Sequence, residues 1–147
     1  MSGPDFPPVP SAEPAPHTAP NGTAQDMAAV TALSPAQRVF LMLQGPHGPF
    51  FDRAARLLRD TGAQVWRVGF NAGDEFFWTD RAHFIRHTGT PEEWPAHLDR
   101  IIAEKGVTDI VLYGDVRPIH AAARRAAARD GLVLHVFEEG YLRPFWI

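Results

Sequence analysis

Residues 109–137 read DIVLYGDVRPIHAAARRAAARDGLVLHVF, and this stretch decides the fold. An apolar run, Asp109 to Tyr113, precedes a helical pattern with an isoleucine and four alanines on one face, and a second apolar run, Leu132 to Phe137, follows. This order predicts a β-α-β unit with two parallel strands. Because the buried helix face is nearly all alanine, we expect the helix to lie very close to its sheet.

The same alternation occurs earlier in the chain. Val39 to Leu43 and Val65 to Phe70 predict two more strands. A helix follows the first of them, and its expected buried face consists of Phe50, Phe51, Ala54, Leu57 and Leu58, with Asp52, Arg53, Arg56 and Arg59 opposite.

Asn71 to Thr88 has no clean period and predicts a long loop with at most one short helix. Thr90-Pro91-Glu92-Glu93 predicts a helix start, with threonine as the N-cap and glutamate three residues later. Glycines at 62, 106 and 131 are expected to end the three helices. The whole pattern predicts an α/β fold, a Rossmann-like sheet of four parallel strands with helices on both faces.

Composition divides the chain into a disordered Pro/Ala-rich tail, residues 1–36, and a Rossmann-like α/β domain, residues 37–147, which we expect to be incomplete. The first 35 residues hold eight of the fourteen prolines and one aromatic residue, too little apolar surface to offset the entropy of ordering them. The tail also carries the whole net charge of −3, so the domain has no basic field to indicate nucleic acid.

Several classes of protein are excluded by residue usage. The chain has no cysteine, which excludes disulfides and thiolate metal sites. No segment approaches the roughly 20 apolar residues of a membrane span, and the N-terminus lacks the features of a signal peptide. We therefore expect a cytoplasmic protein with no resident metal or cofactor.

Each predicted strand ends in a polar loop that contains glycine. In a parallel sheet these four loops lie at one edge, where open α/β folds bind ligands. Any one loop is an ordinary turn, but four together predict a binding edge. The candidate site residues in these loops, and in the helix after the third strand, are Gly45, His47, Gly48, Asn71, Asp74, Asp115, Arg117, His120, Glu138, Glu139, Tyr141 and Arg143.

Four features have two readings. The segment Gln44 to Phe51 lacks the dinucleotide glycine fingerprint, and either presents His47 to a cleft or is a tight turn. Glu138 and Glu139 point to opposite sides of an extended chain, so each is either catalytic or structural. His83 and His87 have the spacing of a helical metal pair but lack a third ligand, so the other reading is an exposed loop or helix face. Phe76, Phe77 and Trp78 form either an acceptor platform or part of the core.

The four loop motifs, read in order, resemble the capsule polysaccharide biosynthesis and export family, and within it the KpsS-type members. The resemblance rests on LQGPHGPFF from Leu43, FNAGD from Phe70, YGDVRP from Tyr113 and EEGYLRP from Glu138, and it covers essentially all of residues 38–147. The tail has no part in it.

The resemblance implies the N-terminal lobe of a two-lobed GT-B glycosyltransferase that adds β-Kdo from CMP-Kdo to a phosphatidylglycerol-type lipid. A nucleotide sugar and a lipid acceptor are the implied partners, with capsule assembly at the inner face of the plasma membrane as the setting. Because the second lobe would normally follow, we expect the fragment alone to be inactive. The alternative is a non-catalytic binding module or a truncated remnant.

Transfer chemistry requires a base or nucleophile at the sugar carbon and donors to the departing phosphate. On this lobe the candidates for catalysis are His47, Asp115, Glu138 and Glu139. The remaining candidates would bind substrate, with Arg117 and Arg143 as anion holders.

Overall fold

The computed structural model describes residues 32–114 and 117–138. The predictions for residues 1–31 and for Asp115, Glu139, Tyr141 and Arg143 fall outside the described residues. A short 3₁₀ helix, η1 (Pro35–Gln37), precedes the first strand.

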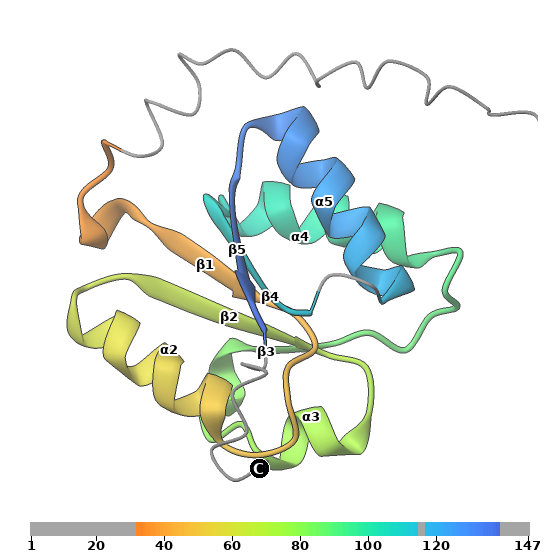
Figure 1. The fold of residues 1–147 in the computed structure, drawn as a ribbon, viewed down its shortest axis with the longest axis horizontal. Coiled ribbons are helices and arrows are strands. Elements are labelled where there is room, and N and C mark those ends of the chain that lie inside the picture. Colours follow the sequence, from red (N-terminus) through yellow and green to blue (C-terminus); the bar gives the residue numbers. More distant parts are fainter. Residues whose placement is uncertain (1–31, 115–116, 139–147) are drawn as a thin grey trace, which may run out of the picture.

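The domain is built on one parallel sheet of five strands (Figure 1). In sheet order the strands are β3 (Phe84–Arg86), β2 (Gln64–Gly69), β1 (Val39–Met42), β4 (Asp109–Tyr113) and β5 (Val133–Phe137). The predicted parallel α/β fold is confirmed, with one strand more than the sequence indicated. The strand order reverses direction between β1 and β4, and open α/β sheets form their ligand crevice at that point.

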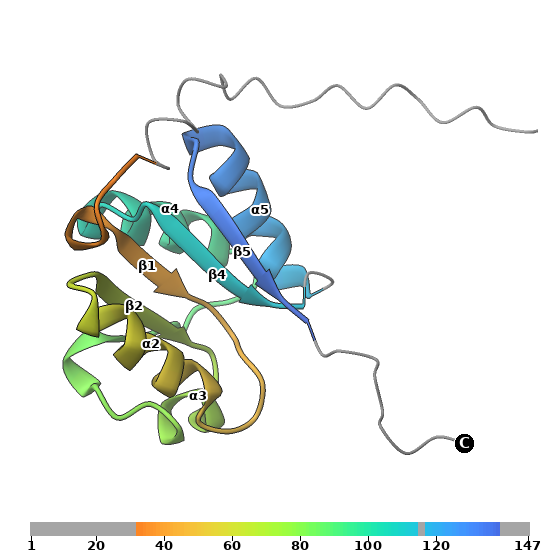
Figure 2. The same ribbon diagram turned by 60° about the vertical axis from the view of Figure 1, so that its left-hand side comes forward.

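Helices cover the two faces of the sheet. They are α2 (Phe50–Asp60), α3 (Ala72–Phe76), α4 (Trp94–Lys105) and α5 (Pro118–Asp130), with a second 3₁₀ helix, η2 (Arg81–His83). The two views in Figures 1 and 2 place α2 and α3 on one side and α4 and α5 on the other. Within residues 32–114 and 117–138, no helix combines the length and the apolar character needed to cross a bilayer.

The larger part of the core lies between the sheet and the α4–α5 pair. Trp94, Leu98 and Ile101 of α4 pack on Leu41 and Ile110 of the central strands. The predicted alanine face of α5 is confirmed, because Ala122, Ala123, Ala126 and Ala127 are all buried there. The indole nitrogen of Trp94 donates to the carbonyl of Ile119, 2.9 Å away, which connects the two helices.

The predicted buried face of α2 is confirmed at Phe51, Ala54 and Leu58, which lie in or against the smaller core cluster, and it is wrong at two positions. Phe50 and Leu57, expected in the core, are 42% and 69% exposed, whereas Asp52 is buried beside Phe51 and Ala55. The reason is a polar contact that the helical period does not show: the Asp52 carboxylate accepts hydrogen bonds from the backbone N–H and the hydroxyl of Thr79. The helix therefore turns a carboxylate inward, and part of its apolar surface faces out.

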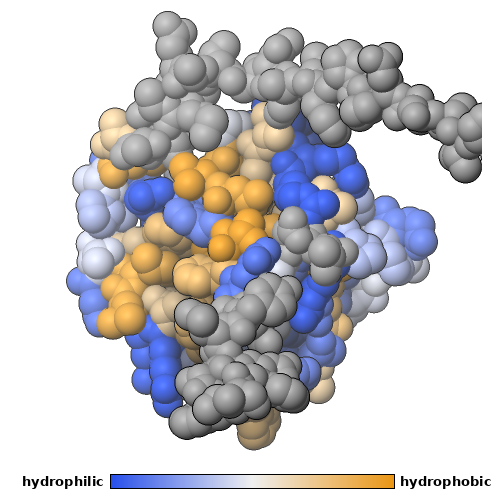
Figure 3. Space-filling model, in the orientation of Figure 1, coloured by the Kyte–Doolittle hydropathy of each residue, from blue (hydrophilic) through white to orange (hydrophobic). Residues whose placement is uncertain are grey.

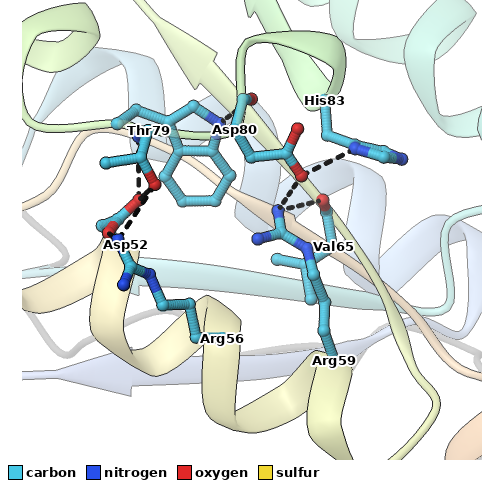
Figure 4. A network of polar contacts seen from close by, with 8 residues as sticks. Asp52, Arg56, Arg59, Val65, Thr79, Asp80 and His83 are labelled. Atoms are coloured by element: carbon cyan, nitrogen blue, oxygen red, sulfur yellow. Dashed lines mark hydrogen bonds and ion pairs between the residues drawn. The ribbon is translucent and has the colours of Figure 1, made fainter.

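The segment that we expected to be a loop contains α3, η2 and the edge strand β3. It is fixed to α2 by the network in Figure 4, in which Asp52 binds Thr79 and Arg56, and Arg59 binds Asp80 and the carbonyl of Val65. Burial alone would raise the pKa of Asp52, but the hydrogen bonds from Thr79 and the charge of Arg56 lower it overall.

Trp78 lies at the centre of this segment and is only 1% exposed. Its indole nitrogen donates to the carbonyl of Asp80, 2.6 Å away, and its ring belongs to the smaller core cluster under α2. Phe76 and Phe77 are 75% and 36% exposed, with ring centroids 5.1 Å apart. Of the three aromatic residues, Trp78 is therefore core, and Phe76 and Phe77 form an exposed pair.

The start of α4 also differs from the prediction. Thr90 to Glu93 forms a turn, in which Glu93 Oε2 accepts the N–H of Thr90 at 2.7 Å, and the helix begins only at Trp94. Pro95 has no N–H to donate to the carbonyl of Pro91, so the helical ladder cannot extend further back. The C-caps were predicted correctly: Gly106 and Gly131 adopt left-handed conformations with φ of 63° and 67°.

One half of the α2-side face of the sheet carries apolar surface. Val133 and Phe137 of β5 pair with Asp109 and Tyr113 of β4, and Phe137 is 42% exposed. The Phe137 ring contacts Phe50, with centroids 5.4 Å apart. Figure 3 shows this apolar surface between α2 and α5 in the orientation of Figure 1.

Gly69, the last residue of β2, is required by close packing. A Cβ atom there would lie 2.2 Å from Cζ of Phe84 on the neighbouring strand. We therefore expect Gly69→Ala to lower the free energy of unfolding by about 1–3 kcal/mol, as overpacking does. Urea denaturation followed by circular dichroism measures the loss. Adding Phe84→Leu, which removes the obstructing ring, should restore part of it, and an unchanged midpoint in Gly69→Ala would contradict the packing argument.

Candidate functional site

Three of the predicted loops meet at the carboxyl edge of the sheet. Residues that follow β1, β2 and β4 surround one small cavity of about 30 Å³. Its lining comprises Gln44, Gly45, Pro46, His47, Arg67, Asn71, Gly73, Asp74, Phe77 and Arg117. Five of these, Gly45, His47, Asn71, Asp74 and Arg117, are among the predicted site residues. A space of this size holds about one water molecule, so it forms the polar floor of a site and does not enclose a sugar.

A buried ion pair forms one wall of the cavity. Arg67 of β2 and Asp74 of α3 are 5% and 7% exposed, and Arg67 Nη2 lies 3.0 Å from Asp74 Oδ1. The other carboxylate oxygen of Asp74 accepts the N–H of Phe70 at 3.0 Å. Asn71 in turn caps α3, because its side-chain oxygen accepts the N–H of Asp74. Asn71 and Asp74 therefore shape the loop after β2 and hold a cation beneath it.

The Arg67 guanidinium lies between two aromatic rings. Its Cζ is 5.1 Å from the ring centroid of Phe51 and 5.9 Å from that of Trp78. Burial lowers the pKa of Arg67, while the negative charges of Asp74 and Asp52 oppose that shift. Its Nε is buried and has no hydrogen-bond partner among the described residues. The cavity thus contains a fixed cation with one unsatisfied donor, because an arginine side chain stays protonated in proteins.

His120 connects the loops on either side of the point where the strand order reverses. It is fully buried at the start of α5, and its Nδ1 lies 2.7 Å from the carbonyl of Gly114. Because a carbonyl only accepts, Nδ1 carries the hydrogen. Burial lowers the pKa of His120, the Gly114 carbonyl opposes this, and the charge of Arg117 lowers it further. The described geometry therefore gives His120 a positioning role, as a neutral imidazole below the surface.

Comparison with known proteins identifies the family of this chain. The family model described as capsule polysaccharide biosynthesis protein matches residues 108–147. The capsule polysaccharide export protein KpsS of Escherichia coli is 40% identical over 108 residues, which are 74% of this chain and 28% of that protein. The chain belongs to the capsule polysaccharide biosynthesis family. The resemblance inferred from the four motifs is thereby confirmed.

Further relatives agree with this assignment. The capsule polysaccharide modification protein LipB of Neisseria meningitidis, from serogroup A and from serogroup B, is 38% identical over 108 residues, or 73% of this chain and 26% of LipB. The chain therefore spans about a quarter of the length of the curated relatives it matches. No solved structure matches the chain significantly.

The other predicted site residues of this capsule-family chain that the structure describes are His47, Gly48 and Glu138. His47 lines the cavity and is exposed, and Gly48 beside it has a φ of 115°, a conformation that favours glycine. Glu138 follows β5 and is also exposed, outside the cavity lining. His47 and Glu138 are thus the two described candidates for catalysis that solvent or a substrate can reach.

The loop after β1 lies directly against α2. A Cβ atom at Gly45 would be 2.6 Å from Cδ2 of Phe51, so the backbone of this loop rests on the same ring that contacts Arg67. Phe51 therefore connects the loop to the buried cation. His47 belongs to the same segment, where it is exposed and lines the cavity.

Sequence reasoning missed Arg67, the buried cation of the site. Arg67 interrupts an otherwise apolar strand, Val65 to Phe70, and a charged residue in such a run is the signal that could have identified it. His83 and His87, whose spacing suggested a helical metal pair, do not share a helix, because His83 ends η2 and His87 follows β3. His83 Nδ1 contacts Asp80 and His87 Nδ1 contacts His97, so the two rings have different partners.

Proposed function

We propose that this chain forms the acceptor-side lobe of a glycosyltransferase that transfers Kdo from CMP-Kdo to a phosphatidylglycerol-type lipid, building the β-Kdo linker of a capsule. The observation that carries the proposal is the cavity at the carboxyl edge of the sheet, where three of the four capsule-family motifs converge on a buried arginine. On this proposal the protein works in the cytoplasm, peripherally at the inner face of the plasma membrane.

The charges at this edge suit an anionic substrate. Arg67, Arg117 and His47 line the cavity, and the carboxylate of Asp74 is already engaged by Arg67 and the N–H of Phe70. Both substrates carry phosphate, and fixed cations or amide donors near a phosphate stabilise bound and departing negative charge. A carboxylate or imidazole that reaches solvent is required as the base, and His47 and Glu138 meet that requirement.

Because the matched relatives are about four times as long as this chain, binding is the appropriate readout for it. We expect isothermal titration to detect binding of lysophosphatidylglycerol below its micellar concentration. Arg117→Ala and His47→Ala should each weaken that binding by about tenfold, the value of a charge-assisted contact. Arg125→Ala, a change at an exposed arginine on the outer side of α5, is the matched control and should bind normally.

The alternative, a non-catalytic module or remnant of the family, predicts a different titration. Such a chain binds neither CMP-Kdo nor lysophosphatidylglycerol at the loop cavity. A second arm uses the E. coli relative, with its matching 108 residues replaced by those of this chain. The chimera should support linker synthesis, and His47→Ala within it should abolish that synthesis while circular dichroism stays unchanged. Wild-type synthesis in the His47 variant would refute the site assignment.

A further inference from the structure

A second pocket lies at the same edge of the sheet, next to the end of β3. It has a volume of about 380 Å³, enough for a small ligand group. Its lining comes from the end of β3 and the loop after it, Arg86, His87, Thr88 and Gly89, and from the turn and first half of α4, Glu93, Ala96, His97 and Arg100. None of these residues belongs to the loop cavity described above.

The charges around this pocket are mainly positive. Arg86, Arg100 and the two histidines line it, with Glu93 as the only carboxylate in its lining. One oxygen of Glu93 already accepts the N–H of Thr90 at 2.7 Å. Arg86 is paired with Glu75 of α3, whereas Arg100 forms no ion pair within residues 32–114 and 117–138. The pocket therefore has more cationic than anionic groups available for a ligand.

The two histidines, His87 and His97, form a hydrogen-bonded pair. His87 Nδ1 and His97 Nδ1 are 2.8 Å apart, and His87 Nε2 lies 3.2 Å from the carbonyl of Thr90. The carbonyl only accepts, so His87 Nε2 carries a hydrogen, and in the neutral pair the hydrogen between the Nδ1 atoms belongs to His97. His97 Nε2 is then the remaining nitrogen that can accept a proton. A proton added there converts it into a donor.

The surroundings of His97 oppose that proton in the empty pocket. Burial lowers the pKa of His97, and the neighbouring His87 and Arg100 lower it further, while Glu104, two helical turns further along α4, opposes the shift. Arg86 of β3 and Glu93 of the preceding turn also line the pocket. A dianion bound here would reverse the balance, because it attracts both guanidinium groups and the protonated imidazole.

From this arrangement we infer that the pocket is a binding site for a phosphoryl group, held as a tetrahedral dianion by Arg86, Arg100 and His97. A cation would meet two arginines, and the described residues contain no group of three histidines or carboxylates able to hold a metal ion. A phosphate monoester in solution and the monoester headgroup of phosphatidic acid present the same dianionic chemistry. The inference rests on this pocket alone and does not depend on the proposed function.

Sulfate is the first probe, because its charge stays constant over the pH range in which histidines titrate. We expect isothermal titration to show sulfate binding that depends on Arg100, with affinity higher by roughly fivefold at about pH 6 than at about pH 8, since binding favours the protonated pair. Long-range ¹H–¹⁵N spectra should show the His97 ring shifting toward the protonated form as sulfate is added. A His97 ring that does not respond would overturn the inference.

Substitutions test which groups hold the anion. Arg100→Gln and His97→Gln should each weaken sulfate binding by about tenfold, and His97→Gln should also remove the pH dependence. Arg100 is exposed, and the half-buried His97 lies 6.1 Å from Trp94 between ring centroids, so the fold should tolerate these changes. His87 packs more closely, at 5.2 Å from Trp94 and 5.7 Å from Phe70. Arg125→Gln on α5 is the matched control. Equal affinity in Arg100→Gln and wild type would exclude the site.

Two more ligands identify the source of the group. One arm titrates inorganic phosphate, and the other measures sedimentation with vesicles that contain phosphatidic acid, a phosphate monoester, against phosphatidylcholine vesicles. Phosphate binding that Arg100→Gln weakens, without vesicle binding, supports a soluble ester. Vesicle binding that Arg100→Gln weakens supports a lipid headgroup. Failure of both arms would overturn the inference, and because His47 and Arg117 are intact in every variant, it would leave the loop cavity untouched.

Discussion

Replacing Asp109 with alanine is expected to lower the free energy of unfolding by about 3–5 kcal/mol, the cost of breaking a buried charge pair from one side. Asp109, the first residue of β4, is fully buried. Arg38 donates to both of its carboxylate oxygens, His135 Nε2 lies 2.8 Å away and the Thr108 hydroxyl lies 2.7 Å away. Removing the carboxylate leaves Arg38, Thr108 and His135 without their common partner.

The polar cluster around Asp109 connects three strands of the sheet. Arg38 precedes β1 and His135 belongs to β5, so Asp109 connects the strands on both sides of β4. The ring of His135 packs on the ring of Phe40, with centroids 5.8 Å apart. The Arg38 guanidinium lies 5.3 Å from the centroid of the Phe40 ring. The α2-side face of β4 and β5, where apolar surface is exposed, is thus held by a polar cluster at its amino end.

Stability should also depend on pH through this carboxylate. Burial alone would raise the pKa of Asp109, but the hydrogen bonds from His135, Arg38 and Thr108 and the charge of Arg38 lower it overall. A carboxylate with a lowered folded-state pKa stabilises the fold above its unfolded-state pKa, and the contribution disappears as pH falls through the folded-state value. Wild type should therefore lose more stability than Asp109→Ala between about pH 6 and about pH 3.

Urea denaturation followed by circular dichroism measures both effects. Asp99→Ala is the matched control, because Asp99 pairs with Arg129 at 3.0 Å on the surface and is 47% exposed. Exposed pairs contribute about 0–1 kcal/mol, so this variant should be nearly as stable as wild type. If Asp109→Ala were no less stable than Asp99→Ala, the cluster would not support the sheet as argued.

The parts of the fold that depend on local pattern could be predicted from the sequence, and the parts that depend on distant contacts could not. The β-α-β unit of residues 109–137 and the helix-ending glycines follow from hydrophobic period and backbone preference. The strand β3 has only three residues, too few for a period to appear. The inward turn of Asp52 depends on Thr79, 27 residues away, which no helical pattern records.

The same distinction applies to the site. The convergence of the loops after β1, β2 and β4 follows from parallel topology, so Gly45, Asn71 and Arg117 could be grouped before the structure was known. The His87–His97 pocket could not, because it forms only where β3 brings the following loop against α4. Because the edge strand β3 was not predicted, the sequence alone could not place the charged residues of this pocket together.

Single substitutions at Arg67 and Asp74 are expected to destabilise strongly, and the double substitution less than their sum. Arg67→Met or Asp74→Asn should each cost about 3–5 kcal/mol, because each leaves a buried charge without its partner. In Arg67→Met/Asp74→Asn both charges are gone, and asparagine can still accept the N–H of Phe70 through its side-chain oxygen. The coupling energy should therefore be roughly 2 kcal/mol or more, as for residues in direct contact.

Circular dichroism is the suitable probe for this cycle, because Trp78 lies beside Arg67 and its fluorescence would change with the substitution itself. The exposed pair of Arg129 and Asp99 provides a control cycle, with an expected coupling of about 1 kcal/mol or less. Additive losses at Arg67 and Asp74 would show that the two side chains act independently, in spite of the 3.0 Å contact.

The double variant also separates the structural role of Arg67 from its role in binding. A folded Arg67→Met/Asp74→Asn chain keeps the loops but has lost the cation at the floor of the cavity, together with the unsatisfied Nε donor. Its affinity for lysophosphatidylglycerol should fall by about tenfold or more, since a buried charge-assisted donor is lost. Wild-type affinity in this variant would restrict Arg67 to holding the loop after β2, and would shift the anion-binding role to Arg117 and His47.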